Sequence, residues 1–106
     1  MLAEFSIYPV GGTRHLSKDI AYLLETLGET GLHFELGPLS TAVEGDWDKV
    51  LEAIHACHRK MVEMHDRVVT MITIDECLSG QHRLAEMVDS VKRQLAAEKH
   101  DAEVEC

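Results

Sequence analysis

The feature of this sequence that most constrains the fold is the changing spacing of its apolar residues. Between residues 2 and 10 apolar and polar side chains alternate, which is the pattern of a strand with one buried face. Between residues 18 and 27 the apolar side chains recur at helical spacing, and Ser17 is expected to cap this helix. The change of period therefore predicts a strand followed by a helix.

The same reasoning predicts the elements that follow. They are strands at 32–37, 39–44 and 67–75, a helix capped by Asp46, and a last helix opened by Ser79 or Gly80. Gly28 and Gly31 are expected to end the first helix, and Gly37-Pro38 is a turn signal between two strands. Trp47 is expected to be a core anchor at the start of the second helix.

The order of these elements is β-α-β-β-α-β followed by an extra helix. Two crossovers around a central hairpin favour the α+β class and the ferredoxin-like plait, with a four-stranded antiparallel sheet and two helices on one face. The domain is expected to span residues 1–98, and the polar tail 99–106 is expected to fray. In this plait the first strand lies beside the third, and the second sheet face is left open.

The open face is expected to be polar and to hold the ligand site. A tight two-residue turn would place Glu35 opposite Ser40, with Glu44 further along the same face. Glu4 and Ser6 reach this face from the first strand. The predicted ligand-binding residues are Glu35, Glu44, Ser6, Ser40 and Glu4. The alternative interpretation is a face that is only solvated or buried in an oligomer.

Composition limits the classes of partner. The 106 residues carry 19 acids and 10 bases, a net charge of −9, so nucleic acid and anionic membranes are poor partners and cationic ligands are favoured. We expect no transmembrane or signal segment, because the sequence has no long apolar stretch and its first residues include no basic region. Its three cysteines are widely spaced, which is typical of reduced thiols in a cytoplasmic protein.

Two local clusters suggest other sites but are weak signals. His55 and His58, with His65 nearby, could share a metal ion, yet no third ligand has convincing spacing, so core or interface histidines are the better interpretation. The 11–15 segment Gly-Gly-Thr-Arg-His could hold a phosphate, although an ordinary connecting loop is favoured. We therefore expect no metal and no cofactor.

Four segments follow one another along the chain: AEFSIYPVG at 3–11, FELGPLSTAVE at 34–44, DRV at 66–68 with ID at 74–75, and SVK at 90–92. In this order they resemble a family of small thiamine-binding proteins. The resemblance covers roughly positions 2 to 95. It implies a ferredoxin-like fold, assembly into dimers and commonly tetramers, and binding of thiamine or its hydroxymethylpyrimidine part.

Together, these expectations predict that the protein is a non-catalytic carrier, buffer or sensor of thiamine or hydroxymethylpyrimidine. An aminopyrimidine needs an acceptor for its amine and a partner for a ring nitrogen, and carboxylates and hydroxyls of the open face offer both, with Glu35 as the main partner. One alternative is a regulatory module of the amino-acid-sensing type. Another is a small enzyme such as an acylphosphatase, but that activity requires an Arg and an Asn near the phosphate, and the sequence contains no Asn.

Overall fold

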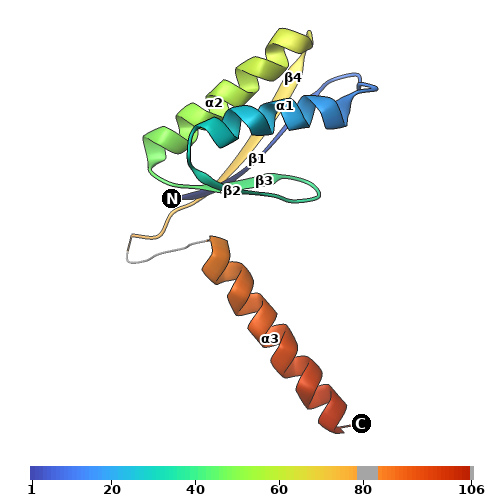
Figure 1. The fold of residues 1–106 in the computed structure, drawn as a ribbon, viewed down its shortest axis with the longest axis vertical. Helices are drawn as coiled ribbons and strands as arrows, with labels where there is room; N and C mark the ends of the chain where they lie inside the picture. Colours follow the sequence, from blue (N-terminus) through green and yellow to red (C-terminus); the bar gives the residue numbers. More distant parts are fainter. Residues whose placement is uncertain (79–83, 106) are drawn as a thin grey trace.

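The computed structural model describes residues 1–78 and 84–105 and has the predicted element order (Figure 1). The elements are β1 (Leu2–Pro9), α1 (Leu16–Glu29), β2 (His33–Leu36), β3 (Thr41–Glu44), α2 (Trp47–Met64), β4 (Val68–Asp75) and α3 (Leu84–Glu105). The strands form one antiparallel sheet in the order β2-β3-β1-β4. The ferredoxin-like α+β fold and the neighbouring positions of β1 and β3 are thus confirmed.

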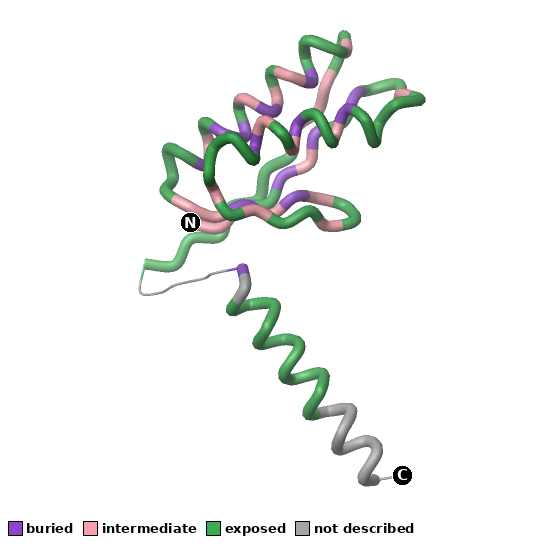
Figure 2. The backbone as a smooth tube through the Cα atoms, in the orientation of Figure 1, coloured by how far each residue is buried: buried purple, intermediate pink, exposed green. Residues whose placement is uncertain are grey.

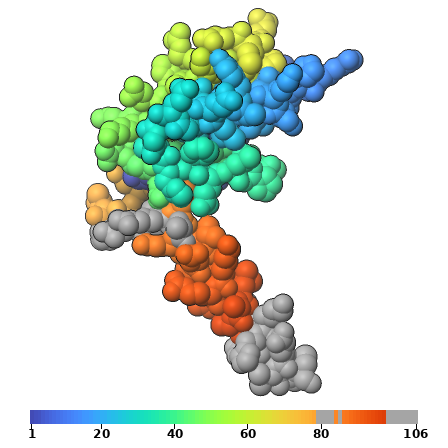
Figure 3. All heavy atoms as spheres, viewed as in Figure 1, coloured from blue at the N-terminus to red at the C-terminus, as the bar shows by residue number. Residues whose placement is uncertain are grey.

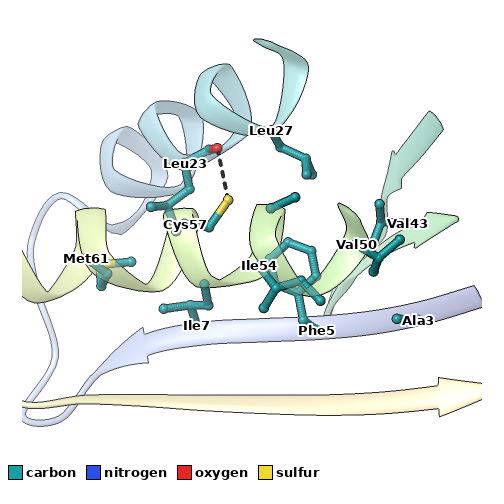
Figure 4. Close-up of a cluster of buried hydrophobic side chains, with 11 residues drawn as sticks. Ala3, Phe5, Ile7, Leu23, Leu27, Val43, Val50, Ile54, Cys57 and Met61 are labelled. Carbon is teal, nitrogen blue, oxygen red and sulfur yellow. Dashed lines mark hydrogen bonds between the residues drawn. The ribbon is translucent and has the colours of Figure 1, made fainter. Parts of the chain in front are cut away.

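The core lies between one sheet face and the two helices α1 and α2, as Figures 2 and 4 show. Alternation along β1 directs its odd-numbered residues to this face, where Phe5 and Ile7 are buried. Leu27 of α1 and Ile54 of α2 close over them and are almost fully shielded from solvent. Burying one such side chain contributes about 1.5–3 kcal/mol, so this cluster is the main source of stability.

Cys57 lies inside the core, on the face of α2 that meets α1. Its thiol donates a hydrogen bond to the backbone oxygen of Leu23 at 3.5 Å (Figure 4). Burial raises the pKa of the Cys57 thiol to about 11, because the thiolate would lose its hydration. At neutral pH the group is therefore a protonated packing residue.

The predicted helix starts need correction. Helix α1 begins at Leu16, so Ser17 lies inside the first turn and caps nothing; the N-cap position belongs to His15. The turn before the helix is fixed instead by Thr13, whose hydroxyl accepts the His15 N–H at 3.1 Å. Asp46 does occupy the N-cap position of α2, but its side chain makes no capping hydrogen bond.

Trp47 was expected in the core, but its side chain is 44% exposed. Side chains of a helix tilt toward its N-terminus, and Trp47 is the first residue of α2. The buried stripe of α2 begins one turn later, at Val50, so the first residue of the helix lies outside the packed part of it. The expectation that Trp47 anchors the core is wrong for this reason.

The predicted pairing within the hairpin is also wrong. Glu35 pairs with Ala42 and Leu36 with Thr41, so Ser40 is not opposite Glu35. Residues 37–40 form a longer turn, in which the Gly37 N–H donates to the Ser40 backbone oxygen at 2.8 Å. Because the register differs by two residues, each side chain keeps the face that alternation predicts.

Helix α3 stands away from the rest of the fold (Figures 1 and 3). The radius of gyration is 17.1 Å, against about 13 Å for a compact chain of this length. The predicted start at Ser79 or Gly80 lies outside the described residues. The backbone is helical through Glu105, and fraying of segment 99–106 stays a prediction.

We predict that Cys57 resists alkylation in the native protein at pH 8 and reacts only on unfolding, because its thiol is buried and its pKa is raised. Iodoacetamide labelling read by peptide mass spectrometry measures this, with protein unfolded in denaturant as the positive control. Labelling of native Cys57 as fast as in denaturant would contradict the packing described here.

Candidate functional site

The open sheet face carries the predicted acidic residues in two adjacent rows. One row runs across the sheet through Glu35, Ala42, Glu4 and Thr73. In the next row Glu44 lies opposite both His33 and Leu2. The expectation that Glu4, Glu35 and Glu44 share one face therefore agrees with the register, although they are spread over three strands.

Three of the five predicted site residues meet where β1 passes the hairpin turn. The Ser40 hydroxyl donates a hydrogen bond to the Glu4 carboxylate at 2.9 Å. Ser6 follows Glu4 on the same face of β1, and both Ser6 and Ser40 line one hollow. A hydroxyl that donates to a carboxylate keeps its oxygen lone pairs free to accept from a ligand.

The other two predicted residues have different surroundings. The Glu44 carboxylate accepts the backbone N–H of Leu84 at 3.0 Å, which places a negative charge at the N-terminus of α3. Glu35 lies 3.7 Å from the imidazole of His33, and both side chains are about half exposed. Such an exposed pair adds little stability. Neither glutamate lines the hollow.

The hollow lies between α1, the end of β1 and the hairpin, and we call it the α1–hairpin hollow. Its volume is about 230 Å³. Its lining is Phe5, Ser6, Ile7, Tyr8, Leu16, Ile20, Leu23, Leu24, Leu36, Pro38, Leu39, Ser40 and Thr41. The wall is therefore mostly apolar, with hydroxyl groups from β1 and from the hairpin.

Large apolar side chains remain exposed around this hollow. Leu39 at the hairpin tip is 90% exposed, Leu36 61%, and Leu16 and Tyr8 about 40%. Exposed apolar residues that cluster at a concavity are typical of ligand or partner sites. Sequence reasoning missed the α1 wall, because the pattern assigns Ile20 and Leu23 only to a helix and does not show which sheet edge they face, and it places Leu16 before the helix.

The two weaker sequence signals lead to ordinary contacts. The His65 imidazole lies 2.7 Å from the Asp19 carboxylate and joins the end of α2 to the first turn of α1. His58 is 2.6 Å from the Thr70 hydroxyl, and His55 is exposed. In the 11–15 loop, Gly11 and Gly12 adopt positive φ angles of 93° and 78°, which other residues rarely adopt.

In residues 1–78 and 84–105, no three side chains of the metal-ligating types cluster closely enough to hold an ion. Across the same residues, no helix combines the length and the apolar character needed to cross a membrane.

Two proteins of other organisms are similar to this chain in sequence. A UPF0045 protein of Methanocaldococcus jannaschii, MJ1052, is 34% identical over 76 residues, which are 72% of this chain and 76% of that protein. A UPF0045 protein of Methanothermobacter thermautotrophicus is 30% identical over 96 residues, 88% of this chain and 97% of that one.

Solved structures show the same fold. The M. jannaschii crystal structure superposes with a TM-score of 0.78 at 28% identity, covering 86% of this chain and 94% of that one. A Thermotoga maritima protein, named as a candidate thiamine biosynthesis or salvage protein, gives 0.75 at 22% identity, covering 85% and 96%. The family model of the thiamine-binding proteins matches residues 3–92. This chain therefore belongs to the thiamine-binding protein family.

Proposed function

We propose that this protein binds thiamine or its hydroxymethylpyrimidine part in the α1–hairpin hollow, without catalysis, as a cytoplasmic carrier, buffer or sensor. Family membership supports a thiamine-related role, and the T. maritima structural neighbour is named for one. The single observation that carries the proposal is the hollow itself, which combines an apolar wall with hydroxyls at one side. This is the arrangement that a flat heteroaromatic ring requires.

The volume of the hollow suggests which part of the ligand enters. Pockets for drug-sized ligands hold roughly 300–1,000 Å³, whereas this hollow holds about 230 Å³. One substituted ring fits that space better than two linked rings. We therefore place the pyrimidine inside and the thiazolium of thiamine at the mouth.

The polar groups of the hollow fit an aminopyrimidine. Ser40 donates to Glu4, so its oxygen can accept a hydrogen bond from a ligand amine. Ser6 supplies a second hydroxyl from β1. A hydroxyl held by a carboxylate is a stronger acceptor than a free one, because hydrogen bonds in a chain polarise each other.

The positive charge of thiamine is favoured at the mouth for two reasons. The chain carries a net charge of −9, which attracts cations. Tyr8 lines the hollow and is 42% exposed, so its ring face is available to a thiazolium. Contacts of this cation–π type contribute about 0.5–1 kcal/mol at exposed sites.

The lining also favours binding over catalysis. Among the described residues that form the hollow, none is Asp, Glu, His, Lys, Arg or Cys. Hydrolysis and group transfer usually need a general acid or base within hydrogen-bond reach of the reacting atom, and hydroxyl groups alone are weak acids and bases. An acylphosphatase-like activity therefore has less support than ligand binding.

We predict that Glu4→Gln weakens thiamine binding about tenfold and that Ser40→Ala weakens it about fivefold, because each removes part of the Glu4–Ser40 acceptor. Isothermal titration calorimetry with thiamine and with hydroxymethylpyrimidine measures both. Added salt should weaken thiamine more than the neutral pyrimidine, since only thiamine carries a fixed positive charge.

Glu35→Gln is the matched control, because it makes the same change in the same row of the open face, outside the hollow. The sequence analysis predicts Glu35 as the main ligand partner, and this variant tests that prediction too. Loss of binding in Glu35→Gln with normal binding in Glu4→Gln would move the site to the β2 end of the sheet. Absence of binding by the natural chain would refute the proposed function.

We also infer that the protein is a homo-oligomer, as a tetramer built from dimers, in which α3 packs against another copy. Beyond Leu84 the apolar stripe of α3 is exposed: Met87 and Val88 by about 40%, Val91 and Leu95 by about 60%. A helix with an exposed apolar stripe is stabilised by a partner surface.

We predict that light scattering gives about four chain masses for the natural protein and that Val91→Asp lowers the value, because a buried carboxylate opposes association. Lys92→Asp, on the next residue of the same helix but outside the stripe, is the control. A monomer at all concentrations would contradict this inference.

A further inference from the structure

The two edges of β1 are paired over different lengths. On one side β1 pairs with β4 along its whole length, from Leu2 opposite Asp75 to Pro9 opposite Val68. On the other side the pairing with β3 ends where Phe5 lies opposite Thr41. The second half of β1 therefore has a neighbouring strand on its β4 side only, within the residues that the structure describes.

The direction of the unpaired backbone groups follows from two hydrogen bonds. Val10 donates its N–H to the Arg67 oxygen, and this pair continues the β1–β4 register. Because the backbone groups of successive residues in a strand point to opposite sides, the even-numbered residues of β1 direct theirs to β4. Gly45 donates its N–H to the Met1 oxygen, so odd-numbered residues face β3. The N–H and C=O of Ile7 therefore point to the β3 side of β1, where β3 no longer pairs with the strand.

The hairpin turn keeps this edge open. Continuing the β1–β3 register would place Leu39 opposite Ile7, but Leu39 belongs to the turn and is 90% exposed. Pro9, the next odd-numbered residue, has no N–H to offer. Ile7 is thus the one residue after Phe5 in β1 with both a donor and an acceptor on this side, and it lines the α1–hairpin hollow.

We infer that the backbone of Ile7 is the specificity-determining group of the hollow, and that it reads the edge of a 4-aminopyrimidine. This inference rests on the proposed function. The exocyclic amine donates to the Ile7 C=O, and the adjacent ring nitrogen, N3, accepts from the Ile7 N–H. In an extended residue these two groups point the same way, so they match a neighbouring donor and acceptor on one flat ring.

With this arrangement the hollow discriminates between ligands by the edge of the ring that enters it. A ligand that lacks N3 leaves the Ile7 N–H without a partner in an apolar surrounding, which costs affinity. The amine has a second N–H, which can donate to the Ser40 hydroxyl, and the Ser6 hydroxyl remains available for another ring substituent. Water can satisfy the same backbone groups when the hollow is empty.

The test is a double-mutant cycle in which binding affinity is measured for two forms of the protein backbone, each with two ligands. The ligands are hydroxymethylpyrimidine and its 3-deaza analogue, a pyridine that lacks N3 and keeps the amine. The protein variant carries the α-hydroxy acid analogue of isoleucine at position 7, an ester that removes the N–H alone. For the natural chain we expect the pyrimidine to bind about tenfold tighter than the analogue, and for the ester chain about equally.

An ester at Asp48 is the control, because its N–H precedes the first hydrogen bond of α2, from Val50 to Asp46, and lies outside the hollow. There the tenfold preference should persist. If the Ile7 ester chain keeps the full preference, this inference is wrong while the proposed function stands. If the natural chain binds neither ligand, the proposed function fails first.

A second measurement uses the natural chain and does not depend on the ester folding. The Ile7 amide proton should exchange more slowly with solvent when the pyrimidine is bound than when the 3-deaza analogue is bound at equal saturation. Equal protection by both ligands would overturn the role of Ile7.

Discussion

The central position of β1 is the constraint on which the rest of this structure depends. Its odd-numbered side chains, Phe5 and Ile7 among them, form the floor of the core under α1 and α2. Its backbone binds β4 along the whole strand but β3 only as far as Phe5. One strand therefore supplies both the packing that holds the helices and the open edge that borders the α1–hairpin hollow.

The acidic residues of the open face make different contacts and therefore have different roles. Glu44 holds the first turn of α3 through the Leu84 N–H, and Glu4 holds the hairpin through Ser40. The second contact belongs to the proposed ligand site, whereas the first positions the helix whose apolar stripe is exposed. The clustering of carboxylates alone does not distinguish these roles, because Glu4, Glu35 and Glu44 share one face.

Sequence patterns predicted those properties that depend on local geometry. Alternation assigned Glu4 and Phe5 to opposite faces, because side-chain direction in a strand follows from the backbone period. The pairing of Glu35 was not predictable in this way, since it depends on the length of the turn at 37–40. Likewise the bond between Glu44 and Leu84 joins residues 40 positions apart, and the hollow needs α1 to lie against the hairpin.

The central claim is that the ligand occupies the α1–hairpin hollow, and mapping of amide chemical shifts by nuclear magnetic resonance tests it most directly. Titration with thiamine should shift the amides of Ser6, Ile7 and Tyr8, of Leu16, and of Leu39 and Ser40 in the hairpin turn, all of which border the hollow. Shifts confined to the row of His33 and Glu44, or no shifts at saturating thiamine, would contradict the account.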